Sequence, residues 1–160
     1  MRADKGEHPF GDAGQWALLG VFLAVWVMDS FWLRISTILS DDIPLYIRLV
    51  ILGVTLMAAI YLFRSGHAVT TREERPNSLV SNGAFRLVRH PLYLASILTY
   101  LGLTVSTMSL FSFVLLVGIF FFYDHIASYE ERLLEARFKG EYKEYKKRTG
   151  KWVPKIGKER

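Results

Sequence analysis

Residues 91–123 read PLYLASILTYLGLTVSTMSLFSFVLLVGIFFFY, a run of 33 residues without a formally charged side chain. As one α-helix this run would extend about 50 Å, whereas the hydrocarbon layer of a bilayer is about 30 Å thick. One helix therefore cannot hold the whole run within a membrane. Its least apolar part is GLTVSTMS at residues 102–109, so we predict a break there and two spans, 91–106 and 109–129.

Two further apolar runs precede this stretch. The first extends from Trp16 to Leu33 and is interrupted only by Asp29, and the second extends from Leu45 to Phe63. Each is close to the roughly 20 residues that a membrane-spanning helix requires. The sequence therefore predicts an all-α fold, a polytopic membrane helix bundle formed by one domain over residues 1–160, with spans at about 16–33, 45–63, 91–106 and 109–129.

The composition of the 160 residues agrees with a membrane protein. Hydrophobic residues make up 51% of the chain, aromatic residues 14% and charged residues only 22%. A disordered chain would contain fewer aromatic side chains and more charge. The absence of cysteine excludes disulfides, thiolate metal ligands and a cysteine nucleophile, and we expect no metal site.

The net charge of +5 is concentrated beside the apolar runs. Residues 64–90 contain five arginines and two glutamates, and residues 130–160 contain 11 basic and six acidic side chains. Because Lys and Arg accumulate on the cytoplasmic side of membrane proteins, this distribution predicts four spans with both termini in the cytoplasm, in the inner membrane if the protein is bacterial. It also favours a membrane over nucleic acid as the partner of the basic segments.

The first candidate functional segment lies in the loop predicted at 64–90. Ser81-Asn82-Gly83 is a turn sequence, and Arg89-His90-Pro91 leads into the third span with proline in its first turn. The start of a helix carries unpaired N–H groups and a partial positive charge, which favour an anionic group. Tyr93 follows on the helical face of His90. The alternative interpretation is a basic membrane anchor with an interfacial tyrosine.

The second candidate segment is residues 130–148, which follow the fourth span. Glu130, Leu134, Phe138 and Tyr142 recur every four residues, so this segment is predicted to be an amphipathic helix on the membrane surface. An anchoring role is sufficient to explain its lysines. Glu130 lies at the edge of the apolar face, where a carboxylate needs a partner. Its neighbour Glu131 points about 100° away and is expected to turn from the centre of that face.

Together the two segments resemble the isoprenylcysteine carboxyl methyltransferase and phospholipid methyltransferase families of integral-membrane enzymes. The family pattern is a Ser-x-Gly turn, then Arg-His-Pro-x-Tyr, and after two further helices Glu-Glu-x-x-Leu followed by Phe, Tyr, Tyr and Pro. In this chain the pattern falls on Ser81, Gly83, Arg89, His90, Pro91, Tyr93, Glu130, Glu131, Leu134, Phe138, Tyr142, Tyr145 and Pro154. The resemblance covers about half of the chain, residues 77–154.

The resemblance implies an enzyme that uses S-adenosyl-L-methionine and methylates a carboxylate, amine or hydroxyl group of a lipophilic acceptor that enters from the bilayer. It assigns cofactor-binding roles to Asn77, Ser78, Leu79, Val80, Phe85, His90, Pro91, Leu92, Tyr93 and Glu130, and catalytic roles to Arg89 and Glu130. The loop 64–90 and the helix 130–148 are then expected to cap the cofactor.

One position departs from the prenylcysteine methyltransferases. Those enzymes carry an arginine four residues before the first glutamate, and this chain has Ile126 there. The sequence therefore leaves open whether the acceptor is a prenylcysteine carboxylate, a phospholipid amine or another lipid. Two further interpretations remain: an NADPH-dependent membrane enzyme related to the sterol reductases, and a membrane scaffold without catalytic activity.

Overall fold

The computed structural model describes residues 11–72 and 79–155. In chain order these form helix α1 (Gly11–Val27), the π-helical turn η2 (Met28–Leu33), the 3₁₀ turn η3 (Ile38–Ser40), α2 (Leu45–Arg72), the 3₁₀ turn η4 (Gly83–Arg86), α3 (Pro91–Thr107) and α4 (Leu110–Arg148). Within these two ranges there is no regular strand, and one isolated parallel bridge joins Val88 to Gly150. The predicted all-α fold is confirmed.

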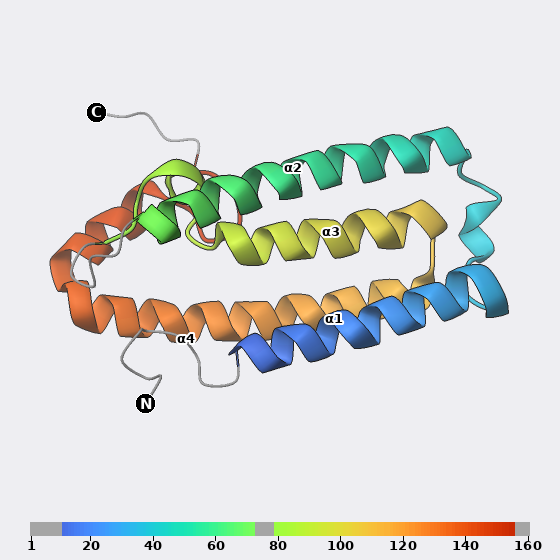
Figure 1. Cartoon of the computed structure of the whole chain (residues 1–160), viewed down its shortest axis with the longest axis horizontal. Helices are drawn as coiled ribbons and strands as arrows, with labels where there is room; N and C mark the ends of the chain where they lie inside the picture. Colours follow the sequence, from blue (N-terminus) through green and yellow to red (C-terminus); the bar gives the residue numbers. More distant parts are fainter. Residues whose placement is uncertain (1–10, 73–78, 156–160) are drawn as a thin grey trace.

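The helices form two pairs stacked in two layers. Figure 1 shows α2 lying along α3 and α1 lying along α4, with η2 and η3 at the end of the bundle opposite to η4. α2 and α3 approach so closely at Gly102 that a Cβ atom there would collide with the Thr55 hydroxyl. Small residues allow membrane helices to pack with their backbones close together. Between the layers, Phe22, Tyr100 and Tyr123 form a buried aromatic core.

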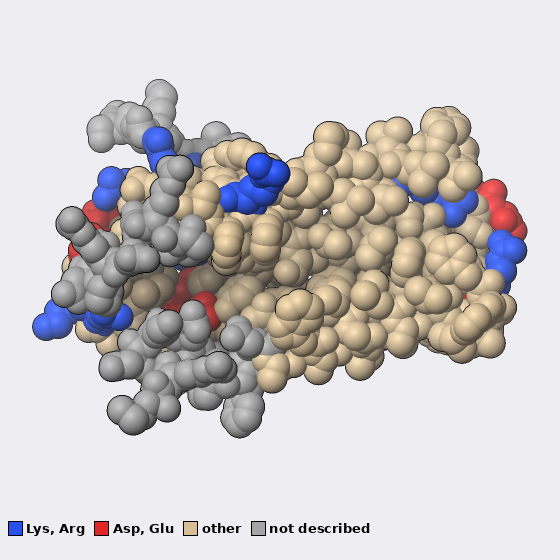
Figure 2. Space-filling view, in the orientation of Figure 1, with Lys and Arg blue, Asp and Glu red and all other residues tan. Residues whose placement is uncertain are grey.

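The outer surface of the bundle is apolar between two charged ends. Trp16, Val50, Met57 and Val114 are each more than 60% exposed, and Figure 2 shows an uncharged band between groups of charged residues at the two ends. Ala13–Leu33, Leu45–Val69 and Leu110–Arg148 are long and apolar enough to cross a bilayer, and α3 is a shorter apolar helix. The chain is therefore an integral membrane protein built as a helix bundle.

The uncharged 33-residue run is divided at Met108 and Ser109. Met108 adopts the left-handed backbone conformation (φ 56°), which ends α3. Ser109 then caps α4, because its Oγ accepts a hydrogen bond from Ser112 N at 3.2 Å. The two helices can therefore run in opposite directions within the thickness of one bilayer.

Asp29, the charged residue of the first apolar run, is buried at this end of the bundle. Its carboxylate accepts hydrogen bonds from Ser36 N at 3.0 Å, from the Ser36 hydroxyl and from Ser109 Oγ at 2.6 Å. The Ser36 hydroxyl oxygen also accepts a hydrogen bond from Phe111 N at 3.0 Å. A buried carboxylate is tolerated when donors surround it, so Asp29 connects the end of the first span to the start of α4.

Two helix boundaries differ from the sequence prediction. α2 continues past Phe63 to Arg72, so the first part of the predicted loop 64–90 is helical. No proline interrupts the sequence before Pro76, and a helix that leaves the bilayer no longer needs apolar side chains.

The predicted C-terminal helix 130–148 also does not begin as a separate element. Residues 110–129 of α4 rise about 30 Å, which crosses the hydrocarbon layer, and the same helix continues beyond it. Within α4 the helical geometry is interrupted at Lys139, whose backbone is non-helical (φ 46°, ψ −112°). The apolar sequence therefore ends where the bilayer ends, while the helix extends further.

Candidate active site

The segment with the Ser-x-Gly turn and the Arg-His-Pro motif is held in place by residues 145–150. Gly83 begins η4 with a φ of 58°, a conformation that glycine adopts without strain. The Phe85 carbonyl accepts a 2.7 Å hydrogen bond from the Tyr145 hydroxyl. Arg89 N donates to the Gly150 carbonyl at 2.9 Å. The last turns of α4 and the residues after it thus fix the segment that precedes α3.

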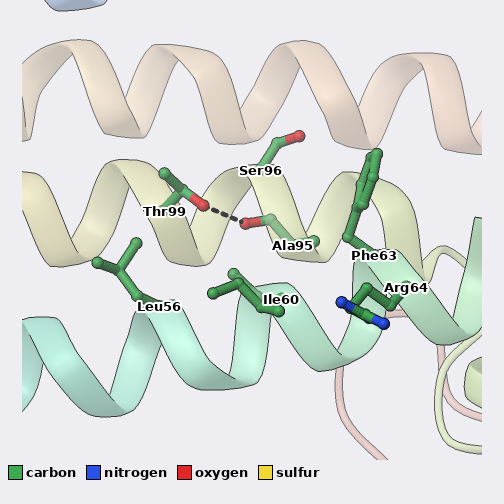
Figure 3. Close-up of a pocket in the computed structure, with 8 residues that line it drawn as sticks. Leu56, Ile60, Phe63, Arg64, Ala95, Ser96 and Thr99 are labelled. Carbon is green, nitrogen blue, oxygen red and sulfur yellow. Dashed lines mark hydrogen bonds between the residues drawn. The ribbon is translucent and has the colours of Figure 1, made fainter.

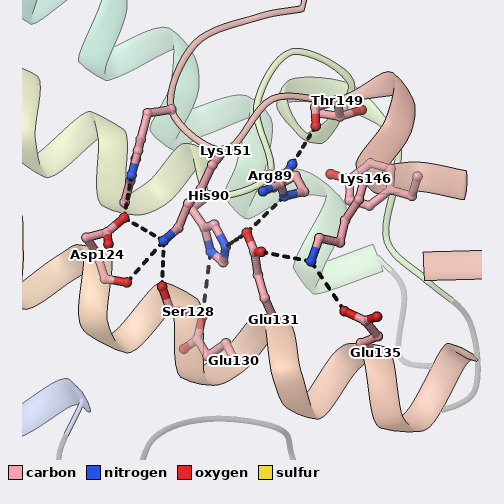
Figure 4. Close-up of polar contacts among 12 residues, drawn as sticks. Arg89, His90, Asp124, Ser128, Glu130, Glu131, Glu135, Lys146, Thr149 and Lys151 are labelled. Atoms are coloured by element: carbon pink, nitrogen blue, oxygen red, sulfur yellow. Dashed lines mark hydrogen bonds and ion pairs between the residues drawn. The ribbon is translucent and has the colours of Figure 1, made fainter. Parts of the chain in front are cut away.

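Arg89 and His90 both contact Glu131 of α4. Arg89 Nε lies 2.9 Å and His90 Nε2 3.2 Å from Glu131 Oε1, as Figure 4 shows. Arg89 Nη1 also donates to the Thr149 carbonyl at 2.7 Å. The three side chains are at most 10% exposed. Glu131 therefore faces the start of α3. Helical periodicity had predicted that its side chain points away from the centre of the apolar face.

These contacts determine the charge states in the cluster. Burial acts to raise the pKa of Glu131, but hydrogen bonds from His90 and Arg89 outweigh it and lower that pKa from 4.5 to about 2. Burial lowers the pKa of His90 below its ordinary 6.5, against the opposing effect of Glu131. At neutral pH His90 is therefore uncharged. Its Nε2–H donates to Glu131, which leaves Nδ1 as an acceptor.

Glu130 lies on the other side of the His90 ring. The Tyr93 hydroxyl donates to Glu130 Oε1 at 2.5 Å, and Glu130 Oε2 is 3.7 Å from His90 Nδ1. The Tyr93 ring stacks on His90 with the centroids 5.8 Å apart, and the Trp152 ring lies 5.9 Å from His90. A carboxylate, a neutral imidazole and two aromatic rings thus converge at the start of α3.

Comparison with known proteins identifies the family of this chain. Residues 45–141 match the PEMT family of phospholipid methyltransferases. The chain belongs to the phospholipid methyltransferase family. This confirms the resemblance expected from the two sequence motifs.

Two curated relatives show how far the similarity extends. The chain is 34% identical over 114 residues to the cobalt-zinc-cadmium resistance protein CzcN of Cupriavidus metallidurans, which covers 71% of this chain and 51% of that protein. It is 34% identical over 92 residues to the protein-S-isoprenylcysteine O-methyltransferase of Saccharomyces cerevisiae, which covers 56% of this chain and 38% of that protein. The chain matches about half or less of the length of these relatives.

Pro91 and Leu92, two family positions in the first turn of α3, pack against α2. A Cβ atom at Gly66 of α2 would lie 3.1 Å from Leu92 Cδ2 and 3.4 Å from Pro91 Cγ. Their side chains therefore hold the helix start in place. Their backbone belongs to a helix start at which the N-cap residue His90 makes no side-chain cap hydrogen bond.

The remaining predicted cofactor-binding residues precede η4. Leu79 and Val80 are partly buried in an irregular segment. Asn77 and Ser78 lie outside the described residues. Across the described ranges, no group of three His, Cys, Asp or Glu side chains could hold a metal ion.

A second polar cluster, which sequence reasoning missed, attaches the tail to α4 beside the site. Lys151 Nζ lies 2.5 Å from Asp124 Oδ1 and donates to Ser128 Oγ at 2.8 Å (Figure 4). Trp152 Nε1 donates to the same Asp124 oxygen at 2.8 Å. Asp124 could have indicated this cluster from the sequence, because a carboxylate near the end of a membrane span requires a partner. This cluster places the Trp152 ring against the site.

Proposed function

We propose that this protein transfers a methyl group from S-adenosyl-L-methionine to a lipophilic acceptor at the membrane interface. The observation that carries the proposal is the meeting of the Arg89-His90-Pro91-x-Tyr93 motif with the Glu130-Glu131 pair at one end of a membrane bundle. Membership of a methyltransferase family supports a methyl donor, and the yeast relative is named as an O-methyltransferase.

The residues at this place suit S-adenosyl-L-methionine. Its amino group requires acceptors, which Glu130 and His90 Nδ1 provide. Its carboxylate suits the first-turn N–H groups of α3, a helix end that attracts anions. Its positively charged sulfur is attracted to aromatic faces such as those of Tyr93 and Trp152. When bound, the cofactor would supply a methyl group activated by that sulfur.

The geometry supports a division of roles. Glu130 and Tyr93 are proposed to contact the cofactor. The sequence motif suggests a catalytic role for Arg89, but its guanidinium is bonded to Glu131 and the Thr149 carbonyl. We therefore propose Arg89 as a positioning residue that fixes the start of α3. Methyl transfer depends on alignment and on exclusion of water, and both require a rigid site.

Binding of S-adenosyl-L-homocysteine, the demethylated form of the cofactor, tests the proposal directly. A ligand at 100 times its dissociation constant stabilises the folded state by about 2.7 kcal/mol. We expect this ligand to raise the melting temperature of the purified protein in detergent, and NADPH to have no effect. Stabilisation by NADPH with no response to S-adenosyl-L-homocysteine would instead support the reductase interpretation.

We also propose that the end of the bundle containing the site faces the cytoplasm, as the arginines and lysines around it favour. The chain has no cysteine, so single cysteines can be introduced at exposed positions. Arg86→Cys lies at the site end and Asp41→Cys at the opposite end; both positions are exposed. In intact cells a membrane-impermeant maleimide should label only Asp41→Cys. Labelling of Arg86→Cys without permeabilisation would overturn the orientation.

A further inference from the structure

A groove of about 230 Å³ lies between α2 and α3, and the site described above does not use it. Figure 3 shows its lining, in which Leu56, Ile60 and Phe63 of α2 face Ala95 and Thr99 of α3, with Arg64 at one end. Pockets for drug-sized ligands usually measure about 300–1,000 Å³. This groove is smaller and mostly apolar, which suits a segment of a single hydrocarbon chain.

The groove runs along α2 and α3, from Arg64 at one end to Leu56 and Thr99 at the other. Arg64 comes 19 residues after Leu45, the first residue of α2, which corresponds to about 29 Å along the helix. This distance matches the thickness of the hydrocarbon layer, so Arg64 lies at its boundary. From Arg64 to Leu56 the groove extends about 12 Å toward the membrane centre. An acyl chain that descends from a lipid head group follows the same direction.

Arg64 supplies a positive charge at the interfacial end of the groove. Within residues 11–72 and 79–155, no hydrogen bond or ion pair involves its guanidinium. Figure 3 shows the side chain extending back along α2 toward Ile60, alongside the groove. Ile60 and Phe63 are 57% and 55% exposed, so the groove is open on the lipid side. A guanidinium forms strong paired hydrogen bonds with phosphate oxygens.

We propose that this groove is a binding site for an anionic phospholipid of the bilayer. The lipid phosphate contacts Arg64, and one acyl chain lies against Leu56, Ile60 and Thr99. The Arg64 charge, which has no partner among the described residues, selects the anionic head group, and the narrow apolar groove admits one chain. The inference concerns a part of the bundle outside the proposed cofactor site and does not depend on the proposed function.

Native mass spectrometry of the delipidated full chain in detergent tests this site. The probe is palmitoyl-oleoyl phosphatidylglycerol, and the diacylglycerol with the same chains serves as the phosphate-free comparison. We expect one phosphatidylglycerol to bind per chain at concentrations where diacylglycerol does not bind. Arg64→Gln should reduce the bound fraction by about fivefold or more, the scale of one lost charge-assisted contact. Thr99→Leu, which fills the groove without altering Arg64, should also reduce it.

Arg132→Gln is the matched control, because it removes an exposed arginine from the same end of the bundle. It should leave lipid binding nearly unchanged. Equal losses in both arginine variants, equal binding of diacylglycerol, or binding insensitive to Thr99→Leu and displaced by inorganic phosphate would each overturn the lipid site. Circular dichroism verifies that the variants fold. Arg64→Gln should retain its response to S-adenosyl-L-homocysteine, so the lipid site and the proposed function can fail separately.

Discussion

Glu130→Gln is expected to weaken binding of S-adenosyl-L-homocysteine at least tenfold, about 1.4 kcal/mol. The substitution removes the negative charge proposed to face the amino group of the cofactor and keeps the shape of the side chain. The Tyr93 hydroxyl, 2.5 Å from Glu130 Oε1, can still donate to the amide oxygen, so the fold should be retained. Calorimetric titration of the purified variant measures the change in affinity.

Glu135→Gln is the matched control for this experiment. Glu135 lies on the same helix and pairs with Lys146 at 3.3 Å, but its side chain is 36% exposed. Among the residues that the structure describes, it forms no hydrogen bond or ion pair with His90 or Tyr93. Its replacement should leave the affinity unchanged. If Glu130→Gln bound the ligand as tightly as the wild type, Glu130 would only anchor the helix, and the proposed cofactor site would be wrong.

Glu131→Gln is expected to reduce the stability of the fold more than the affinity for the cofactor. Glu131 is the buried partner of Arg89 at 2.9 Å and of His90 at 3.2 Å. Removal of one member of a buried ion pair leaves an uncompensated charge and typically costs about 3–5 kcal/mol. For a chain of this size, such a loss lowers the melting temperature by roughly 10 °C. A thermal melt in detergent measures it, with Glu135→Gln again as the exposed control.

The same pair predicts a dependence of stability on pH. Because the folded protein lowers the pKa of Glu131 from 4.5 to about 2, its contribution is complete above pH 4.5 and is lost as the pH falls toward 2. The melting temperature of the wild type should therefore decline across this interval more steeply than that of Glu131→Gln. Parallel pH profiles of the two proteins would show that the carboxylate does not stabilise the fold.

Arg89→Lys is expected to be an intermediate case. A lysine restores the positive charge beside Glu131, but a single ammonium group cannot reproduce the planar guanidinium that bonds Glu131 and the Thr149 carbonyl together. The start of α3 should then be held less firmly. A smaller loss of stability than in Glu131→Gln, accompanied by weaker ligand binding, would agree with a positioning role.

The sequence by itself determined the helical membrane bundle and the two segments that form the candidate site. Apolar runs of suitable length identify membrane helices because the bilayer requires every backbone polar group to be bonded internally. The turn at Gly83 and the helix start at Pro91 could be predicted because both depend on local backbone preferences. The motifs then indicated the family, which the comparisons confirmed.

Only the tertiary structure decided how the charged groups are paired. Helical periodicity predicted that Glu131 points away from the candidate site. In the structure Glu131 instead forms hydrogen bonds with Arg89 and His90, and Glu130 forms one with Tyr93. These pairings depend on how α3 and α4 pack together. The bend at Lys139 and the bond from Arg89 N to the Gly150 carbonyl then bring the tail back to the start of α3. Contacts between residues so far apart in the chain depend on packing, which local sequence preferences do not specify.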